Sequence, residues 1–163
     1  MNHFDPKQKR WDDQRKIASQ DYPLIGPSDS GDDHAQECHA LLMKITGLDG
    51  VISDLNDNEM NHRNTQKLIP WLKKAGLSFA ACYEDQAVKS LKNGEDIQQA
   101  EKDLHWAEEH FFADPSNVKE DGRPVLLVFG PQRLKWKFDL STQPLVFGLS
   151  HLIKQNGLDG AFA

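Results

Sequence analysis

The stretch Gly76-Leu-Ser-Phe-Ala-Ala-Cys-Tyr-Glu-Asp85 is typical of a buried parallel strand that ends at a functional edge. It begins with a glycine, where a preceding helix is expected to end, and its middle is apolar. It finishes on an aromatic residue and two acids, Tyr83, Glu84 and Asp85. The segment therefore predicts a strand over 77–83 that delivers polar side chains to its carboxyl end.

Helices and strands are expected to alternate on both sides of this strand. The spacing of apolar residues predicts helices over 32–46, 64–75, 96–111 and 150–156. Further strands are predicted over 50–55, 125–129 and 144–149, and another opens at residue 160. The run 125–129 is apolar at every position, as expected for a strand covered on both faces. Residues 1–21 are polar and aperiodic, so we expect an arm or loop there and a domain over 22–163.

Details inside these elements carry further expectations. The first helix should turn one apolar stripe to the core, formed by Cys38, Leu41, Leu42 and Ile45. Residues 56–64 are polar and predict a loop. Pro70 lies inside the second helix, where it either starts a shorter helix or kinks this one. Asp121-Gly122-Arg123-Pro124 predicts a turn.

Three junctions share one design, in which a glycine and a leucine lead from a helix into a strand. They begin at Gly47, Gly76 and Gly157. Such αβ turns in an alternating chain favour a parallel sheet, either doubly wound or closed as a (β/α)8 barrel. There is no G-x-G-x-x-G and no Walker loop, which favours the barrel. A full barrel takes about 250 residues, so the 163 residues here predict an α/β fold that is a partial (β/α)8 TIM-type barrel.

Composition restricts the classes of partner. The net charge of −6, from 25 acidic and 19 basic residues, does not favour nucleic acid. Cys38 and Cys82 sit in no C-x-x-C motif and the histidines form no H-x-x-x-H motif, so we predict no metal and no cofactor. No apolar run approaches the roughly 20 residues that span a bilayer, and no secretory signal is visible. The chain is therefore expected to be cytoplasmic by default.

Candidate site residues follow the predicted strands, because barrel sites are built at the carboxyl ends of strands. They are Asp54, Tyr83, Glu84, Asp85, Gln132 and His151. Carboxylates that bind hydroxyls, beside an aromatic ring that stacks on a pyranose, suit a sugar. Each residue also has a structural interpretation: the acids can cap loops or helices, and His151 can simply pack.

Five motifs occur in an order that resembles glycoside hydrolase family 71/99-like proteins, which are related to endo-α-mannosidases. The motifs are Tyr22-Pro-Leu-Ile-Gly-Pro-Ser-Asp-Ser-Gly-Asp32, Gly47-Leu-Asp-Gly-Val-Ile-Ser-Asp54, Ala81-Cys-Tyr-Glu-Asp85, Gly122-Arg-Pro-Val-Leu-Leu-Val-Phe-Gly-Pro131 and Asp159-Gly-Ala-Phe162. The resemblance implies a (β/α)8 barrel that cleaves or binds α-linked glycans. It implies that Glu84 matches a strand-end acid of the sugar site, with Asp29, Asp54 and Tyr83 nearby. It also implies a parent protein of a kind often found outside the cytoplasm.

The sequence departs from the family pattern at three places. Ser28 stands where the family usually has an aromatic residue, and Leu55 and Asn56 stand where it has a tryptophan and another aromatic. The paired catalytic glutamates of the related mannosidases lie farther along the chain than residue 163. We therefore expect a partial or degenerate copy without the catalytic pair, which if active would hydrolyse O-glycosyl bonds. The alternative is a non-catalytic carbohydrate- or protein-binding remnant that self-associates through an open sheet edge, burying Leu145, Phe147 and Phe162.

Overall fold

The computed structural model describes residues 25–26, 28–55, 59–88, 94–129, 138–149 and 158–162. Within them the α-helices are α1 (Asp33–Ile45), α2 (Glu59–Lys74) and α3 (Glu95–Ala107). A 3-10 turn, η2 (Asp85–Val88), follows the second strand, and a π-helical turn, η3 (Glu108–Phe112), continues α3. The strands are β1 (Gly50–Leu55), β2 (Ser78–Glu84), β3 (Lys119–Glu120), β4 (Arg123–Phe129), β5 (Leu145–Leu149) and β6 (Gly160–Phe162).

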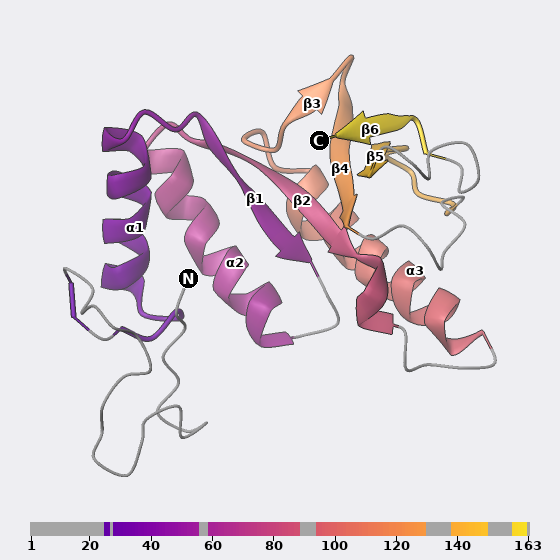
Figure 1. Ribbon diagram of the computed structural model, residues 1–163, viewed down its shortest axis with the longest axis horizontal. Coiled ribbons are helices and arrows are strands. Elements are labelled where there is room, and N and C mark those ends of the chain that lie inside the picture. The colour runs from indigo at the N-terminus through magenta and orange to yellow at the C-terminus, as the bar shows by residue number, and fades with distance from the viewer. Residues whose placement is uncertain are drawn as a thin grey trace, which may run out of the picture.

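A single parallel sheet forms the centre of the molecule (Figure 1). Its strands lie in the order β1-β2-β4-β5-β6, and every neighbouring pair along this path is parallel. The short β3 pairs with β4 in the antiparallel sense. Because strands alternate with helices and all parallel strands point the same way, their carboxyl ends share one edge. This architecture confirms the predicted partial TIM-type barrel.

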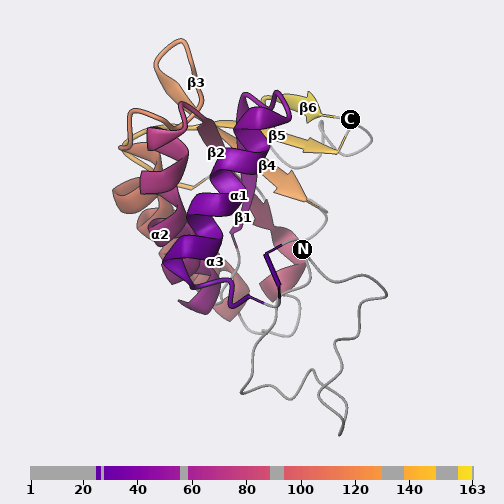
Figure 2. The same ribbon diagram turned by 90° about the vertical axis from the view of Figure 1, so that its left-hand side faces the viewer.

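The described helices lie on one face of the sheet (Figure 2). Residues that alternate along the strands point to this face and pack with the helices in one hydrophobic core. The strand residues in that core are Leu55, Phe79, Ala81, Tyr83, Leu126, Val128 and Val146. Ser53 points the same way, and its hydroxyl bonds Thr65 of α2 at 3.0 Å. The core thus lies between sheet and helices.

The opposite face of the sheet carries no helix among the described residues. Ile52 on β1 is 62% exposed and Phe129 at the end of β4 is 55% exposed. Val125 and Leu127, which share the face of Phe129, are half-buried. The expectation that strand 125–129 is covered on both faces is therefore wrong for this structure. We call this surface the open face.

Two of the three predicted αβ turns are present. Gly47 and Gly76 have positive φ angles of 84° and 65°, which a side-chain-bearing residue rarely adopts. In each case the following leucine N–H bonds back into the helix, from Leu48 to the Met43 carbonyl and from Leu77 to the Leu72 carbonyl. These are Schellman-type ends that turn the chain directly into a strand. The third turn, at Gly157, and the predicted helix 150–156 lie outside the described residues.

Helix α1 buries a different face from the one predicted. Asp32 caps it by accepting the Ala35 N–H, and its buried residues are Ala35, Gln36 and Ala40. The predicted apolar stripe faces outward: Leu41 is 51% exposed and Ile45 is 80% exposed. Helix α1 packs against α2, and Gln36, one of its buried residues, donates to the Asn64 carbonyl of that helix.

Helix α2 begins earlier than predicted. It starts at Glu59, so the predicted loop over 56–64 and the predicted helix start at 64 are both wrong at this boundary. Acidic Glu59 in the first turn and basic Lys73 and Lys74 in the last turn suit the helix dipole. Pro70 stays inside the helix, which continues to Lys74. The turn predicted at 121–124 is present at Asp121 and Gly122, which both have positive φ, while Arg123 and Pro124 already belong to β4.

Among the described residues, no helix combines the length and the apolar character needed to cross a membrane.

Candidate functional site

The carboxyl ends of β1, β2 and β4 bring an acid pair and an aromatic ring to the open face. The strand register places Asp54 opposite Cys82, and Glu84 opposite Phe129. Opposite residues on parallel neighbours point to the same face, and so do residues two apart on one strand. Asp54, Cys82, Glu84 and Phe129 therefore share one surface at the edge where barrel proteins build their sites.

The Cys82 thiol lies on the same face as both carboxylates, opposite Asp54 and two residues before Glu84. Its pKa is raised to about 11, first by burial and then by the negative charge of Asp54. Glu84 adds a smaller effect in the same direction, while a hydrogen bond with the Phe129 backbone lowers the pKa. One thiol therefore feels both acids and contacts the end of β4. Asp54, Glu84 and Phe129 surround it as a cluster.

Tyr83 lies on the other side of the sheet from this cluster. Its side chain has no exposed surface, and its hydroxyl donates to the Asp103 carboxylate of α3 at 3.2 Å. Gln99 also donates to Asp103, at 2.8 Å. In this structure Tyr83 ties β2 to α3, and its ring is enclosed in the core. The sequence predicted an exposed aromatic ring at Tyr83. On the open face, the exposed aromatic ring is that of Phe129.

Asp85 is also enclosed. It is the first residue of η2, and its side chain has no exposed surface. Gln132 and His151 lie outside the described residues. The structure thus brings together Asp54 and Glu84 of the predicted set, and separates Tyr83 and Asp85 from them.

Asp29 lies in the loop before α1, at the same edge of the molecule. Helix α1 contacts α2, and Figure 1 shows α2 between α1 and the carboxyl end of β1. The Asp29 carboxylate accepts the Gly31 N–H at 2.8 Å, an Asx-turn contact that shapes the loop. Asp29 also lines a pocket of about 420 Å³ between this loop and α2.

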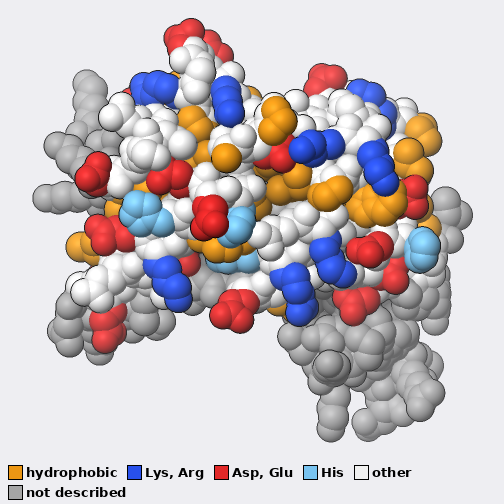
Figure 3. Space-filling model, turned by 180° about the vertical axis from the view of Figure 1, so that it is seen from behind, with side chains coloured by type: hydrophobic (Ala, Val, Ile, Leu, Met, Phe, Trp, Pro, Cys, Tyr) orange, Lys and Arg blue, Asp and Glu red, His pale blue; other side chains and the backbone are white. Residues whose placement is uncertain are grey.

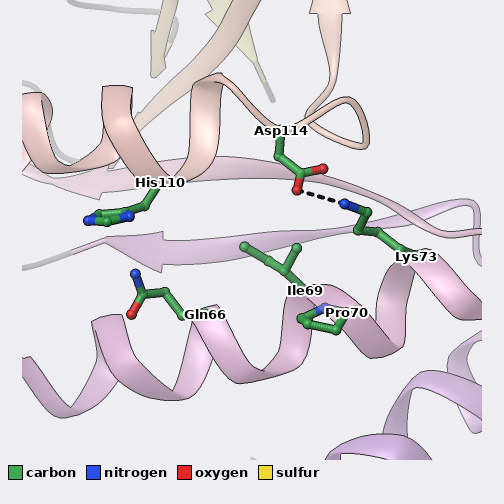
Figure 4. Close-up of a pocket in the computed structure, with 6 residues that line it drawn as sticks. All are labelled: Gln66, Ile69, Pro70, Lys73, His110 and Asp114. Carbon is green, nitrogen blue, oxygen red and sulfur yellow. Dashed lines mark hydrogen bonds and ion pairs between the residues drawn. The ribbon is translucent and has the colours of Figure 1, made fainter.

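A second pocket, of about 450 Å³, lies on the helix-covered face (Figure 4). One stripe of α2 lines it with Gln66, Ile69, Pro70 and Lys73, and His110 and Asp114 close the opposite side. Lys73 and Asp114 form an ion pair at 3.0 Å across its end. The hydrogen bond to the Ser116 N–H and this ion pair outweigh partial burial and lower the pKa of Asp114.

Two histidines near this pocket pack against the ring of Trp106. The His62 ring stacks on Trp106 with 4.1 Å between centroids, and His110 lies 4.8 Å from the same indole. Across the described part of the chain, no three His, Cys, Asp or Glu side chains are grouped to hold a metal ion. Figure 3 shows charges of both signs scattered over this face, with hydrophobic side chains between them.

Phe129 is the site residue that sequence reasoning missed. The apolar run 125–129 suggested uniform burial, yet strand alternation and the register with Glu84 place this ring on the open face. The available signal was the position of Phe129 as the last residue of the strand, immediately before Gly130-Pro131. A large aromatic at a strand end faces the edge that carries function in a barrel.

Comparisons with known proteins find relatives by structure only. No family model matches the sequence, and no curated protein matches it. The endo-α-mannosidase of glycoside hydrolase family 99 from Bacteroides thetaiotaomicron is similar over 89% of this chain and 47% of its own, with a TM-score of 0.68 and 18% identity. The same enzyme in complex with bis-tris-propane gives a TM-score of 0.67, again at 18% identity, over 89% of this chain and 50% of that one.

A third solved structure, described as a glycoside hydrolase-like protein, is more distant. It has a TM-score of 0.57 and 9% identity over 80% of this chain and 47% of its own. The chain thus spans about half the length of the structures it matches. At these identities the likeness concerns the fold. The chain has the fold of a partial TIM barrel, of the kind found in these glycoside hydrolase structures.

Proposed function

We propose that this chain is a glycoside hydrolase-like module that binds α-linked glycans on the open face, at the carboxyl ends of β1, β2 and β4. Asp54 and Glu84 bind sugar hydroxyls, and Phe129 packs against the apolar face of a pyranose ring. The observation that carries the proposal is the convergence of two carboxylates and an exposed aromatic ring on one surface.

The chemistry of these groups suits a sugar. An ionised carboxylate is a hydrogen-bond acceptor, and sugar hydroxyls are donors. Hydrogen bonds to a charged acceptor are stronger than neutral ones. Phe129 is 55% exposed, so its ring face is accessible without any rearrangement of the core. The fold shared with glycoside hydrolase structures supports the same ligand class.

Binding, rather than hydrolysis, is the activity we propose for these residues. Hydrolysis of an O-glycosyl bond needs two carboxyl groups placed on opposite sides of that bond. Asp54 lies opposite Cys82, two residues before Glu84, so both acids sit on adjacent strands and face the same way. They suit the recognition of hydroxyls more than the flanking of a scissile bond.

The other predicted residues have separate places in the proposal. Tyr83 holds β2 against α3 and acts on the sugar site only by positioning the strand. Asp85 is enclosed beside it. Asp29 belongs to the neighbouring loop at the same edge. Gln132 and His151, which follow β4 and β5 in the sequence, remain predicted sugar-binding residues.

Titration calorimetry with an α-linked mannotetraose tests the proposal. Wild-type chain should bind it, and Glu84→Gln and Asp54→Asn should each weaken binding about tenfold, the loss expected when a charged hydrogen bond is removed. Phe129→Ala should weaken binding about three- to tenfold, the range typical of an aromatic contact. Glu101→Gln and Ile97→Ala are matched controls, because both are exposed residues of α3 on the helix-covered side. Equal losses in the controls and the site variants would refute the assignment.

A non-catalytic protein-binding module is a second candidate. One observation favours it: the exposed apolar residues include Leu41 and Ile45 on α1 and Ile52 on the open face of β1. Exposed apolar patches mark contact surfaces for other proteins or for a second copy. Light scattering at increasing concentration tests self-association. A monomer at all concentrations would rule out self-association, including the predicted contact through Leu145, Phe147 and Phe162.

A further inference from the structure

Helix α1 presents a row of large apolar side chains to the outside of the molecule. Leu41 is 51% exposed, Ile45 is 80% exposed and Leu42 is 40% exposed. The other side of the helix, with Gln36 and Ala40, is buried, and α1 contacts α2. Among the described elements, α1 lies at one end of the molecule, with no helix or strand beyond it (Figure 1 and Figure 2). An exposed apolar surface of this kind marks a contact with another molecule.

The spacing along α1 is that of a helix that pairs with another helix. Residues on its outer side follow one another at intervals of four, three and four positions: His34, Cys38, Leu41 and Ile45. This is the heptad spacing of a two-helix contact. His34 is exposed and Cys38 is half-buried, so each of the four has surface left for a partner. We call these four residues the α1 seam.

Two opposite charges flank the α1 seam on one side. Glu37 and Lys44 stand directly before Cys38 and Ile45, seven positions apart, so they lie on the same flank. Within the described part of the chain neither forms an ion pair. The Lys44 ammonium donates one hydrogen bond, to the Gly76 carbonyl at 3.2 Å, and the side chain is exposed. An acid and a base on one flank are complementary to the same flank running in the opposite direction.

We propose that the α1 seam docks on the α1 seam of a second copy of this chain, as an antiparallel helix pair about a twofold axis. In this register Cys38 packs against Leu41 of the partner subunit, and Ile45 packs against His34 of the partner subunit. Twofold symmetry forms each contact twice, because the same surface is used by both copies. The antiparallel direction also sets the two helix dipoles in opposition, which favours the pair.

The flanking charges select this direction and register. The register that closes the seam also sets Glu37 beside Lys44 of the partner subunit, and symmetry repeats the ion pair on the other side of the axis. In a parallel pair Glu37 would lie beside Leu42 of the partner subunit, and both ion pairs would be lost. Charge complementarity therefore favours a second copy of α1 in the antiparallel arrangement.

A contact limited to one helix pair is small. Helix α1 has 13 residues, and at 1.5 Å per residue it is about 20 Å long. The buried area falls below the roughly 1,200 Å² at which stable interfaces begin, so the dimer should form only at high protein concentration. This surface differs from the predicted contact through Leu145, Phe147 and Phe162. It is also separate from Asp54, Glu84 and Phe129, so the inference does not rest on glycan binding.

Sedimentation equilibrium of the 163-residue chain, over about 10 µM to about 1 mM, measures the dimer. A reducing agent keeps Cys38 from forming a disulfide. Wild type should dimerise, and Leu41→Glu should weaken the dimer at least about tenfold, because it places two carboxylates in an apolar contact. Ile97→Glu is the matched control: Ile97 is 50% exposed on α3, and this variant should dimerise like wild type.

A charge reversal tests the direction and register of the pair. Glu37→Lys and Lys44→Glu should each weaken the dimer about three- to tenfold, because each puts like charges side by side. The double variant that carries both substitutions restores the opposite charges and should dimerise like wild type. Circular dichroism verifies that each variant is folded.

Three results would overturn the proposal. The first is a wild-type chain that stays monomeric at every concentration, which would leave the α1 seam to a different partner. The second is a dimer that persists in Leu41→Glu or is lost equally in Ile97→Glu. The third is a double charge variant that dimerises no better than the single variants. Loss in Leu41→Glu together with rescue in the double variant supports it.

Discussion

Glu84 and Tyr83 are adjacent in sequence but lie on opposite faces of β2. Glu84 faces the open side with Cys82, whereas Tyr83 faces α3 and bonds Asp103. The alternation of a strand decides which of two neighbouring polar residues can reach a ligand. At the scale of single residues, the candidate site therefore consists of side chains on one face of the sheet: Asp54 on β1, Glu84 on β2 and Phe129 on β4.

The Cys82 thiol provides a test at the same scale. With a pKa of about 11, only about 1% of it is thiolate at pH 9. Removing the Asp54 charge should lower that pKa, so Asp54→Asn should react faster with iodoacetamide at pH 9. Mass spectrometry of the alkylated peptide measures this, with Asp33→Asn on α1 as the control. An unchanged rate in Asp54→Asn would show that this acid is not close to Cys82.

The raised pKa also makes stability depend on alkaline pH. The folded chain favours the neutral thiol, so this contribution is complete below the ordinary pKa of 9 and is lost as pH rises from about 9 to about 11. Cys82→Ala should remove this part of the alkaline loss. Chemical denaturation of both proteins at pH 8 and pH 11 measures it. Parallel decreases in wild type and variant would contradict the assigned cause, which is chiefly burial of the thiol.

At the scale of elements, α2 contains a built-in weakness at Pro70. Proline has no N–H, so the Gln66 carbonyl loses the hydrogen bond that residue 70 would donate. Pro70 is exposed, so a smaller side chain leaves no cavity in the core. Pro70→Ala should raise the free energy of unfolding by about 1–3 kcal/mol. Urea denaturation tests this, and Gln98→Ala on α3 should have little effect. A Pro70→Ala protein that is less stable than wild type would contradict this prediction.

Glu108 in the π-helical turn η3 connects this element to the segment before β5. Its carboxylate accepts hydrogen bonds from the Thr142 N–H at 2.7 Å, the Thr142 hydroxyl at 2.8 Å and the Ser141 hydroxyl at 2.9 Å. Partial burial opposes ionisation, but these contacts outweigh it and lower the pKa of Glu108. Glu108→Gln should destabilise the fold by about 1–2 kcal/mol. The neighbouring Glu109, whose side chain is 77% exposed, gives the matched control Glu109→Gln.

The sign of the pH effect at Glu108 follows from the lowered pKa. The stabilisation is complete above the ordinary value of 4.5 and is lost as pH falls through the lower folded value. The difference in unfolding free energy between wild type and Glu108→Gln should therefore shrink below about pH 4. A difference that stays constant down to pH 2 would mean that the charge of Glu108 contributes nothing.

The sequence predicted where the helices and strands lie better than it predicted which contacts they make. The glycines at 47 and 76 predicted the helix ends because only glycine takes a positive φ at little cost. The stripe of α1 was misassigned because periodicity identifies an apolar face without showing what that face contacts. We predicted Tyr83 in the site, although the alternation of side chains along a strand places it on the other face of the sheet from Glu84. Pairing of Gln36 with Asn64 was not predictable, since the two residues lie 28 positions apart in sequence.

At the scale of the whole molecule, one sheet face is packed and the other is open. The packed face holds the hydrophobic core and all the described helices (Figure 2). The open face, in a fold that covers 47% of a barrel-type endo-α-mannosidase, carries the proposed sugar-binding residues. Stability and ligand binding thus use opposite faces of the same strands. Site variants on the open face should therefore leave the unfolding free energy within about 0.5 kcal/mol of wild type.

The most direct test of the account is an NMR titration of the ¹⁵N-labelled chain with an α-linked mannotetraose. The account predicts shifts in the amide signals around Asp54, Glu84 and Phe129, and their loss in Glu84→Gln. Amides of α3, on the packed face, should not move. No shifts at millimolar glycan, or shifts confined to the pocket between α2 and η3, would contradict the claim that the open face binds sugar.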